Sequence, residues 1–336
     1  KLKEAENCCR KSIGLNPNIF NSHFLLSSIL IEQKKFQEAE QSLRKTIELK
    51  PDFAVAHSNL GGILLERGQL KEAEISTRKA IELLPNDINS IFNLGKILKK
   101  LGNIKGAEKL FRKTIEINPN FIQAHLNLGS IVKEIGELKE AEICYRNSIK
   151  INPNLFNSHF FLANILIEQT RIKEAEEPLR KTIELKPDFA DAHHNLGCIM
   201  KDIGKPEEAK KFFRKAIELK PSFAKTNYLL SQVLSEEKNF KDSIIEIKQA
   251  IKKDKNNHIY QGELTRLNFI LGEINKNKNN SKTIWEDSDD YFLEDNAQEN
   301  LLVIFGSNGW NNKIPPFNFY NLFKENRSFD KLFLRD

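Results

Sequence analysis

Several residue types and patterns are scarce or missing in this chain of 336 residues. No run of 18 apolar residues occurs, so the sequence predicts no membrane-spanning helix. The 52 basic and 46 acidic residues leave a net charge of +6, and no basic stripe carries interleaved aromatic residues. This pattern argues against a nucleic-acid partner. Cysteine is also sparse, and its spacing fits neither a zinc site nor a redox pair, which favours a reducing cytoplasm: Cys8, Cys9, Cys144 and Cys198.

What the chain does contain is a proline at a fixed interval of 34 residues. A period of this length predicts a solenoid of stacked units, none of which buries its apolar face alone. Such proteins present a binding surface and rarely carry chemistry, so we predict no enzymatic activity in this segment and no cofactor. The repeating prolines are Pro17, Pro51, Pro85, Pro119, Pro153, Pro187 and Pro221.

Other positions repeat in register with the prolines. An alanine stands twelve residues before each proline, and a leucine followed in four units by glycine stands upstream. These columns predict two amphipathic helices per unit, with small residues where the helices cross closely. A glycine in the loop between the two helices, such as Gly68 or Gly102, suits a helix C-terminus. The predicted full units are 20–53, 54–87, 88–121, 122–155, 156–189 and 190–223, with a degenerate seventh at 224–257.

The columns resemble the tetratricopeptide repeat family. Its pattern of Leu-Gly, Ala, an aromatic residue, a small residue and Pro is met in Leu94-Gly95, Ala107, Phe111, Thr114 and Pro119. The resemblance implies an all-α, right-handed superhelical solenoid of helix-turn-helix repeats. One departure is regular, because histidine replaces the family's aromatic residue early in the first helix. A full repeat separates these histidines, so we predict part-buried, hydrogen-bonded imidazoles and no metal site: His23, His57, His125, His159 and His193.

A larger duplication is superimposed on the short repeat. The segments 20–53 and 156–189 agree at 25 of 34 positions, four units apart. We infer that a block of four units was copied whole, so each unit in the first block has a sister 136 residues later. A surface presented by one block is expected to be presented twice.

One polar column is the candidate binding site. The position before the repeated leucine is asparagine in four of seven units and faces the predicted concave surface. An asparagine side chain both donates and accepts hydrogen bonds, so a row of them can follow a peptide main chain. The row resembles the asparagine array of O-GlcNAc transferase repeats, which implies the same role for Asn59, Asn93, Asn127 and Asn195. Leu25 and Phe161 interrupt it. The alternative is that these asparagines only cap or bridge neighbouring helices.

Three lysines further along the same helices extend the candidate site. Lys96, Lys99 and Lys133 are expected to favour an acidic ligand. Together with Asn93 they partly resemble the clamp by which some tetratricopeptide domains hold a C-terminal carboxylate. Lysines on helices are more commonly just solvated, and that alternative stays open.

The predicted organisation is a solenoid at 1–257, a capping helix at 258–276, a linker at 277–297 and a truncated α/β segment at 298–336. In the last segment, 301–305 is predicted to be a strand, followed by a helix and a second, parallel strand. The predicted function is a scaffold that holds an extended protein or peptide segment in its concave groove, with self-association possible. The alternative function is the substrate-recruiting arm of a larger enzyme, either α/β-hydrolase-like or a glycosyltransferase, with its catalytic domain beyond residue 336.

Overall fold

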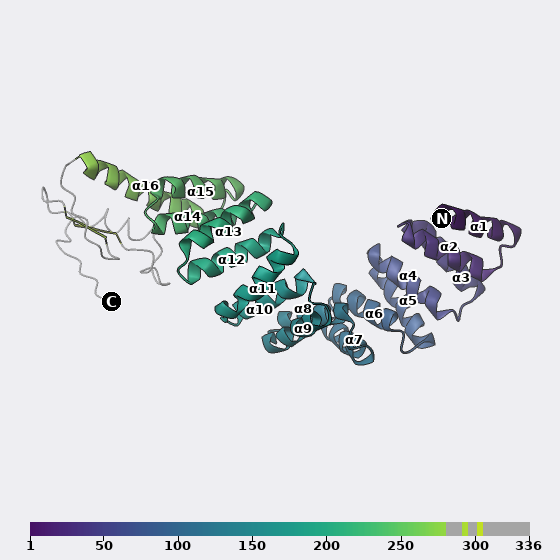
Figure 1. Cartoon of the computed structure of the whole chain (residues 1–336). Helices are drawn as coiled ribbons and strands as arrows, with labels where there is room; N and C mark the ends of the chain where they lie inside the picture. The colour runs from purple at the N-terminus through teal and green to yellow at the C-terminus, as the bar shows by residue number, and fades with distance from the viewer. Residues whose placement is uncertain (280–290, 295–300, 305–336) are drawn as a thin grey trace. The chain divides into compact units, whose positions relative to one another are not determined.

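The computed structural model describes residues 1–279, 291–294 and 301–304. Residues 2–279 form a succession of helices joined by short turns, two helices to each 34-residue repeat (Figure 1), and the two short C-terminal ranges are strands. The predicted all-α repeat fold is therefore confirmed. The helices are α1 (Leu2–Leu15), α2 (Phe20–Glu32), α3 (Phe36–Leu49), α4 (Ala54–Glu66), α5 (Leu70–Leu83), α6 (Ile88–Lys100), α7 (Ile104–Ile117), α8 (Ile122–Glu134), α9 (Leu138–Ile151), α10 (Phe156–Glu168), α11 (Ile172–Leu185), α12 (Ala190–Asp202), α13 (Pro206–Leu219), α14 (Ala224–Glu236), α15 (Phe240–Lys253) and α16 (His258–Asn279).

The turns follow the repeating prolines and glycines. Each glycine in the loop between the two helices of a unit has a left-handed backbone, with φ of 76° at Gly68 and 82° at Gly102. A residue without Cβ adopts this conformation with little strain. At the other end of the unit, α3 stops at Leu49 because Pro51 excludes the helical conformation from Lys50, whose φ is −143°.

Two compact units divide the chain, Lys1–Pro178 and Leu179–Asp336. In the first unit α4 lies against α5, α6 lies against α7, and α4 also contacts α6 directly (Figure 1). In the second unit the same pairing joins α12 to α13 and α14 to α15. In the six full units, the column alanines of the second helices and the column leucines of the first helices are all buried, as the columns predict.

Glycine permits the two helices of a unit to approach closely. A Cβ atom at Gly95 would lie 2.7 Å from Cε1 of the fully buried Phe111 ring. One at Gly197 would lie 2.6 Å from the ring of Phe213. Carbon atoms in ordinary contact are about 3.5–4.0 Å apart, so only glycine fits beside these rings.

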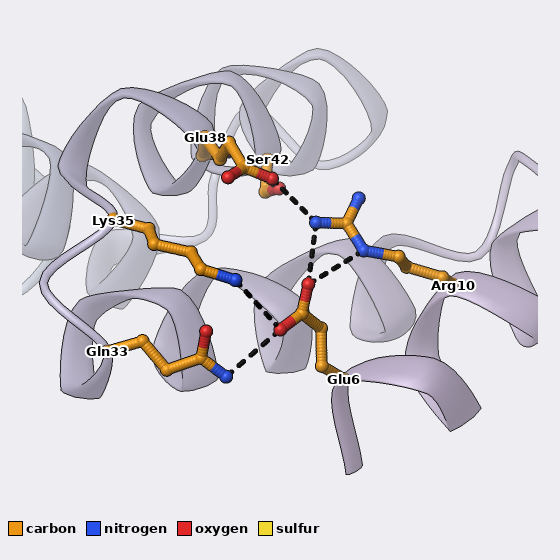
Figure 2. Close-up of polar contacts among 6 residues, drawn as sticks. All are labelled: Glu6, Arg10, Gln33, Lys35, Glu38 and Ser42. Atoms are coloured by element: carbon orange, nitrogen blue, oxygen red, sulfur yellow. Dashed lines mark hydrogen bonds and ion pairs between the residues drawn. The ribbon is translucent and has the colours of Figure 1, made fainter. Parts of the chain in front are cut away.

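Ion pairs join the second helix of one repeat to the next repeat. Figure 2 shows the first such cluster, in which Glu6 on α1 accepts hydrogen bonds from Arg10 (2.8 and 2.9 Å), Gln33 (3.0 Å) and Lys35 (3.2 Å). Arg10 also donates to Glu38 on α3 at 2.6 Å. Arg10, followed by Gln33 and Lys35, lowers the pKa of Glu6 to about 2. The next two repeats continue this arrangement with Arg44 bound to both Glu40 and Glu72.

The C-terminal described residues depart in part from the prediction. Helix α16 covers the predicted capping helix and buries Leu267 and Ile270. Strand β2 (Leu301–Ile304) lies within the predicted strand, but its partner β1 (Tyr291–Glu294) falls in the predicted linker. The two strands pair antiparallel, with Tyr291 opposite Ile304, a pairing that the sequence analysis did not predict. The predicted helix and second strand after residue 305 lie outside the described residues.

Candidate functional site

The first two asparagines of the predicted row line one cavity in the first unit. Asn59 on α4 and Asn93 on α6 are half-buried and border a cavity of about 380 Å³, together with Lys96. Gly62 lies beside Asn93, whose Nδ2 would be 3.6 Å from a Cβ on that glycine, an ordinary contact distance. Within the described residues neither carboxamide has a hydrogen-bond partner, so both are available to a ligand.

The other asparagines lie elsewhere. Asn127 on α8 donates from Nδ2 to the carbonyl of Gln123 at 2.7 Å, which occupies one of its two donor hydrogens within its own helix. Asn195 lies on α12, in the second unit. The structure therefore brings together Asn59 and Asn93, and the sequence reasoning did not distinguish these two from the rest of the row.

The row is interrupted in two different ways. Leu25 is 54% exposed on α2, where an apolar side chain is held in water. Phe161 on α10 is half-buried and packs against Tyr145, with ring centroids 5.4 Å apart. An aliphatic group at one interruption and a packed ring at the other present apolar contact area beside the polar row.

Each predicted lysine is paired with a carboxylate. The Nζ atom of Lys96 lies 3.7 Å from Glu66, and that of Lys133 lies 2.6 Å from Glu168. Lys99 lies 3.7 Å from the carboxylate of Glu134. These partly exposed pairs are individually weak, about 0–1 kcal/mol each. An acidic ligand would compete with these glutamates for the lysines.

A polar network that the sequence reasoning missed includes two residues of the cavity wall, Ser58 and Asp87. Asp87 caps α6, and its Oδ2 accepts from the Ser90 amide at 2.9 Å and from the Ser58 hydroxyl at 3.2 Å. The hydroxyl oxygens of Ser58 and Ser90 lie 2.8 Å apart. The available signal was the departure of this unit from the residues that the other units carry at positions 58 and 87.

The repeated histidines hold the turns between units. Nε2 of His125 lies 2.8 Å from the carbonyl oxygen of Pro119, and the other four histidines make the same contact to their own prolines at 2.8–2.9 Å. The predicted hydrogen bonds are confirmed, and the predicted partial burial holds for His23 and His57, whereas His125, His159 and His193 are buried. Among the described residues, no group of three or more His, Cys, Asp or Glu side chains is placed to hold a metal ion.

Comparison with protein families agrees with this repeat geometry. Two family models, each described as tetratricopeptide repeat, match the chain, one at residues 30–94 and one at residues 88–121, 122–155 and 190–223. The last three segments have the limits of three predicted units. The chain is a tetratricopeptide repeat protein. Repeats of this kind build extended binding surfaces, which makes the chain an interaction scaffold by class, and such repeats are generally not catalytic.

Solved structures share the fold of this tetratricopeptide repeat protein. PilF of Pseudomonas aeruginosa is 18% identical with a TM-score of 0.55, over 60% of this chain and 92% of that chain. A tetratricopeptide repeat protein of Parabacteroides merdae is 18% identical with a TM-score of 0.52, over 74% and 98%. A structure of the Cut9–Hcn1 hetero-tetramer is 14% identical with a TM-score of 0.54, over 80% and 52%. At these identities the likeness shows the fold alone.

Curated sequences and helix hydropathy give two negative findings for the described tetratricopeptide repeat protein. No curated protein sequence matches it significantly. Of the helices in the described part of the chain, none combines the length and the apolar character that a membrane crossing needs.

Proposed function

We propose that this tetratricopeptide repeat protein binds an extended segment of a protein partner along the exposed side of its first helices. Asn59 and Asn93 hold the main chain of that segment, Asn127 extends the contact within the first compact unit, and Asn195 makes the same kind of contact within the second. The proposed role is binding and not catalysis, in the cytoplasm. No described residue favours the alternative of a substrate-recruiting arm of a larger enzyme.

The observation that supports this proposal is the pair of carboxamides on the cavity wall. Asn59 and Asn93 stand one repeat apart, have no intramolecular partner among the described residues and border the same cavity of about 380 Å³. Each carboxamide supplies a donor and an acceptor, which is the pairing that one peptide unit requires. The partly exposed lysines beside them leave a preference for acidic ligands as a hypothesis, because each already contacts a glutamate.

The test uses the full chain and peptides selected on it from a phage-displayed library of random linear sequences. The selected peptides are then synthesised with a single N-methyl group at each successive amide, which removes one main-chain donor at a time. We expect Asn93→Ala and Asn59→Ala each to weaken binding about five- to tenfold, as the loss of a net hydrogen bond of about 1 kcal/mol implies. N-methylation of the amide that faces the missing carboxamide should then have no further effect.

Asn120→Ala is the matched control, because Asn120 is an exposed residue in the turn before α8. This variant should bind all peptides as the parent does. Equal affinity of the parent and the Asn59→Ala and Asn93→Ala variants, at unchanged helical content, would show that the asparagines are structural. The search for a partner surface would then move to the second helices.

A further inference from the structure

Most full units contain a pair of rings that unit 54–87 lacks. In that unit Ser58 stands where four of the other five full units have an aromatic residue in the first helix, and Asp87 stands where the same four have phenylalanine after the second. Unit 122–155 has leucine at both positions, so unit 54–87 alone among the six is polar at both. The ring centroids are 4.9 Å apart for Phe24 and Phe53, 4.9 Å for Phe92 and Phe121, and 5.2 Å for His194 and Phe223.

A third difference lies at the same place. In the sister unit 190–223, the ammonium group of Lys220 lies 4.1 Å from the centroid of the Phe223 ring and 3.6 Å from Asp191. The equivalent residues of unit 54–87 are Leu84 and Val55, which are 48% and 43% exposed. Compared with its sister, unit 54–87 lacks the lysine, the aromatic ring and the carboxylate of Asp191, and has instead the carboxylate of Asp87 and two exposed apolar side chains.

Hydrogen bonds fix the orientation of the Asp87 carboxylate and engage one of its two oxygen atoms. Its Oδ2 atom accepts from the Ser90 amide (2.9 Å), the Ser90 hydroxyl and the Ser58 hydroxyl (3.2 Å). Within the described residues, no hydrogen bond engages Oδ1. A carboxylate oriented in this way is ready to accept a charge-assisted hydrogen bond from an incoming donor.

The remaining lining of the cavity suits a long cationic side chain. Glu66 and Lys96 pair with each other at 3.7 Å, which leaves the charge of Asp87 without a cationic partner in the cavity wall. Ile31, Phe36, Val55, Ile63 and Leu84 form apolar walls. Methylene stems of lysine and arginine lie favourably along such walls while the charged head reaches a polar group.

We propose that this cavity is a side-chain pocket for a lysine or arginine of the bound segment, with Asp87 as its counter-ion. The incoming cation takes the role that Lys220 has in the sister unit, and Asn59 and Asn93 hold the main chain on either side. This inference deepens the proposed function and rests on it for the main-chain contacts. The pocket itself is tested separately from them.

The first experiment uses small probes that have one side chain and no extended main chain. The methylamides of N-acetyl-arginine, N-acetyl-lysine, N-acetyl-glutamate and N-acetyl-leucine are titrated into the full isotope-labelled chain, and backbone amide shifts are followed by NMR. Ser90 is the reporter because its amide donates directly to Asp87. Thr226, at the sister position, is an internal control, since His194 and Phe223 fill the corresponding space there. The arginine and lysine probes should shift Ser90 saturably and leave Thr226 unchanged.

Two variants separate charge from shape. Asp87→Asn keeps the size and the helix-capping ability of the residue but removes its charge. It should weaken binding of the arginine probe at least about tenfold, or about 1.4 kcal/mol. The double variant Ser58→Phe with Asp87→Phe restores the ring pair that units 20–53 and 88–121 already carry, and should abolish the Ser90 response while the helical content stays unchanged.

The outcomes distinguish the pocket from the proposed main-chain binding. A response of Ser90 to the arginine probe that Asp87→Asn abolishes supports the pocket, even if no linear peptide is selected and the main-chain proposal fails. A Ser90 amide that does not respond to the cationic probes, or that responds equally to the glutamate probe, overturns the pocket. So does an arginine affinity that Asp87→Asn leaves unchanged. Peptides whose binding depends on Asn93 but shows no basic preference would leave the main-chain proposal standing alone.

Discussion

Substitution of Gly95 by alanine tests whether close helix contact, and not loop flexibility, explains the glycine column. The new Cβ would lie 2.7 Å from Cε1, 3.0 Å from Cδ1 and 3.1 Å from Cζ of Phe111. The ring is fully buried and also packs against Phe92, with ring centroids 5.6 Å apart, so it has little room to move away. Relief of the contact requires a shift of about 1 Å to reach ordinary carbon separation.

The expected change in stability is the difference between two effects. Overpacking of a dense core costs about 1–3 kcal/mol. Alanine in place of glycine inside a helix contributes about 1 kcal/mol in the opposite direction. We therefore expect Gly95→Ala to destabilise the protein by about 1 kcal/mol. Gly62→Ala, where the nearest atom to the new Cβ is 3.6 Å away, should instead stabilise it by about 1 kcal/mol.

The assay is guanidinium unfolding followed by circular dichroism, together with amide hydrogen exchange to locate the effect in α6 and α7. Local exchange is needed because long repeat arrays do not always unfold in one step. Combining Gly95→Ala with Phe111→Leu should remove the collision, since Leu43 faces a residue with a Cβ, Ser27, in unit 20–53. The double variant should then be about 1–3 kcal/mol more stable than the sum of the two single-variant changes in unfolding free energy predicts. A Gly95→Ala variant as stabilised as Gly62→Ala would refute the reasoning.

Three further predictions concern titration and reactivity. Arg10 lowers the pKa of Glu6 from 4.5 to about 2. The stability that this pair contributes should therefore be fully present above pH 4.5 and should be lost as the pH falls to 2. Between pH 4.5 and pH 2, the melting temperature should fall less in Glu6→Gln than in the parent. Burial, followed by repulsion from the neighbouring Lys225, lowers the pKa of His194 from 6.5 to about 4. An NMR titration should therefore show a neutral imidazole at pH 5.5. Because the unfolded chain takes up a proton at this residue before the folded chain does, stability falls as the pH drops from 6.5 to 4, and His194→Phe should lessen that fall. Burial raises the pKa of the Cys144 thiol to about 11, whereas Cys8 is exposed. Iodoacetamide at pH 8 should therefore label Cys8 much faster than Cys144. Equal labelling rates for the two cysteines in the folded protein would contradict the packing of Cys144.

The fold was predictable because its determinants are local and repeat. Pro51 ends one helix and Gly68 turns the chain after the next, and both act through the backbone of their immediate neighbours. The alanine and leucine columns then specify which side of each helix is buried. The histidine contacts were also within reach, because each imidazole meets a carbonyl only six residues earlier in the chain.

The site was less predictable because its contacts join separate repeats. Sequence spacing placed Asn127 in the same column as Asn93, but only the side-chain conformation shows that one donates within its own helix and the other borders a cavity. The lysines likewise looked free, and their glutamate partners lie on neighbouring first helices. The antiparallel partner of β2 was missed because the acidic segment around Tyr291 carries no alternating apolar pattern that would predict a strand.

By itself, the sequence of this protein determined the repeat: its period, its two helices, its turns and the residues that face the core. These depend on backbone preferences and on the burial of apolar side chains, and both are properties of short segments. The tertiary structure alone decided which polar groups are left available. That outcome depends on distances between helices that no local pattern encodes. Ser58 and Asp87 replace two aromatic residues of most other units, and the space is a cavity because residues of the neighbouring repeats line it on both sides.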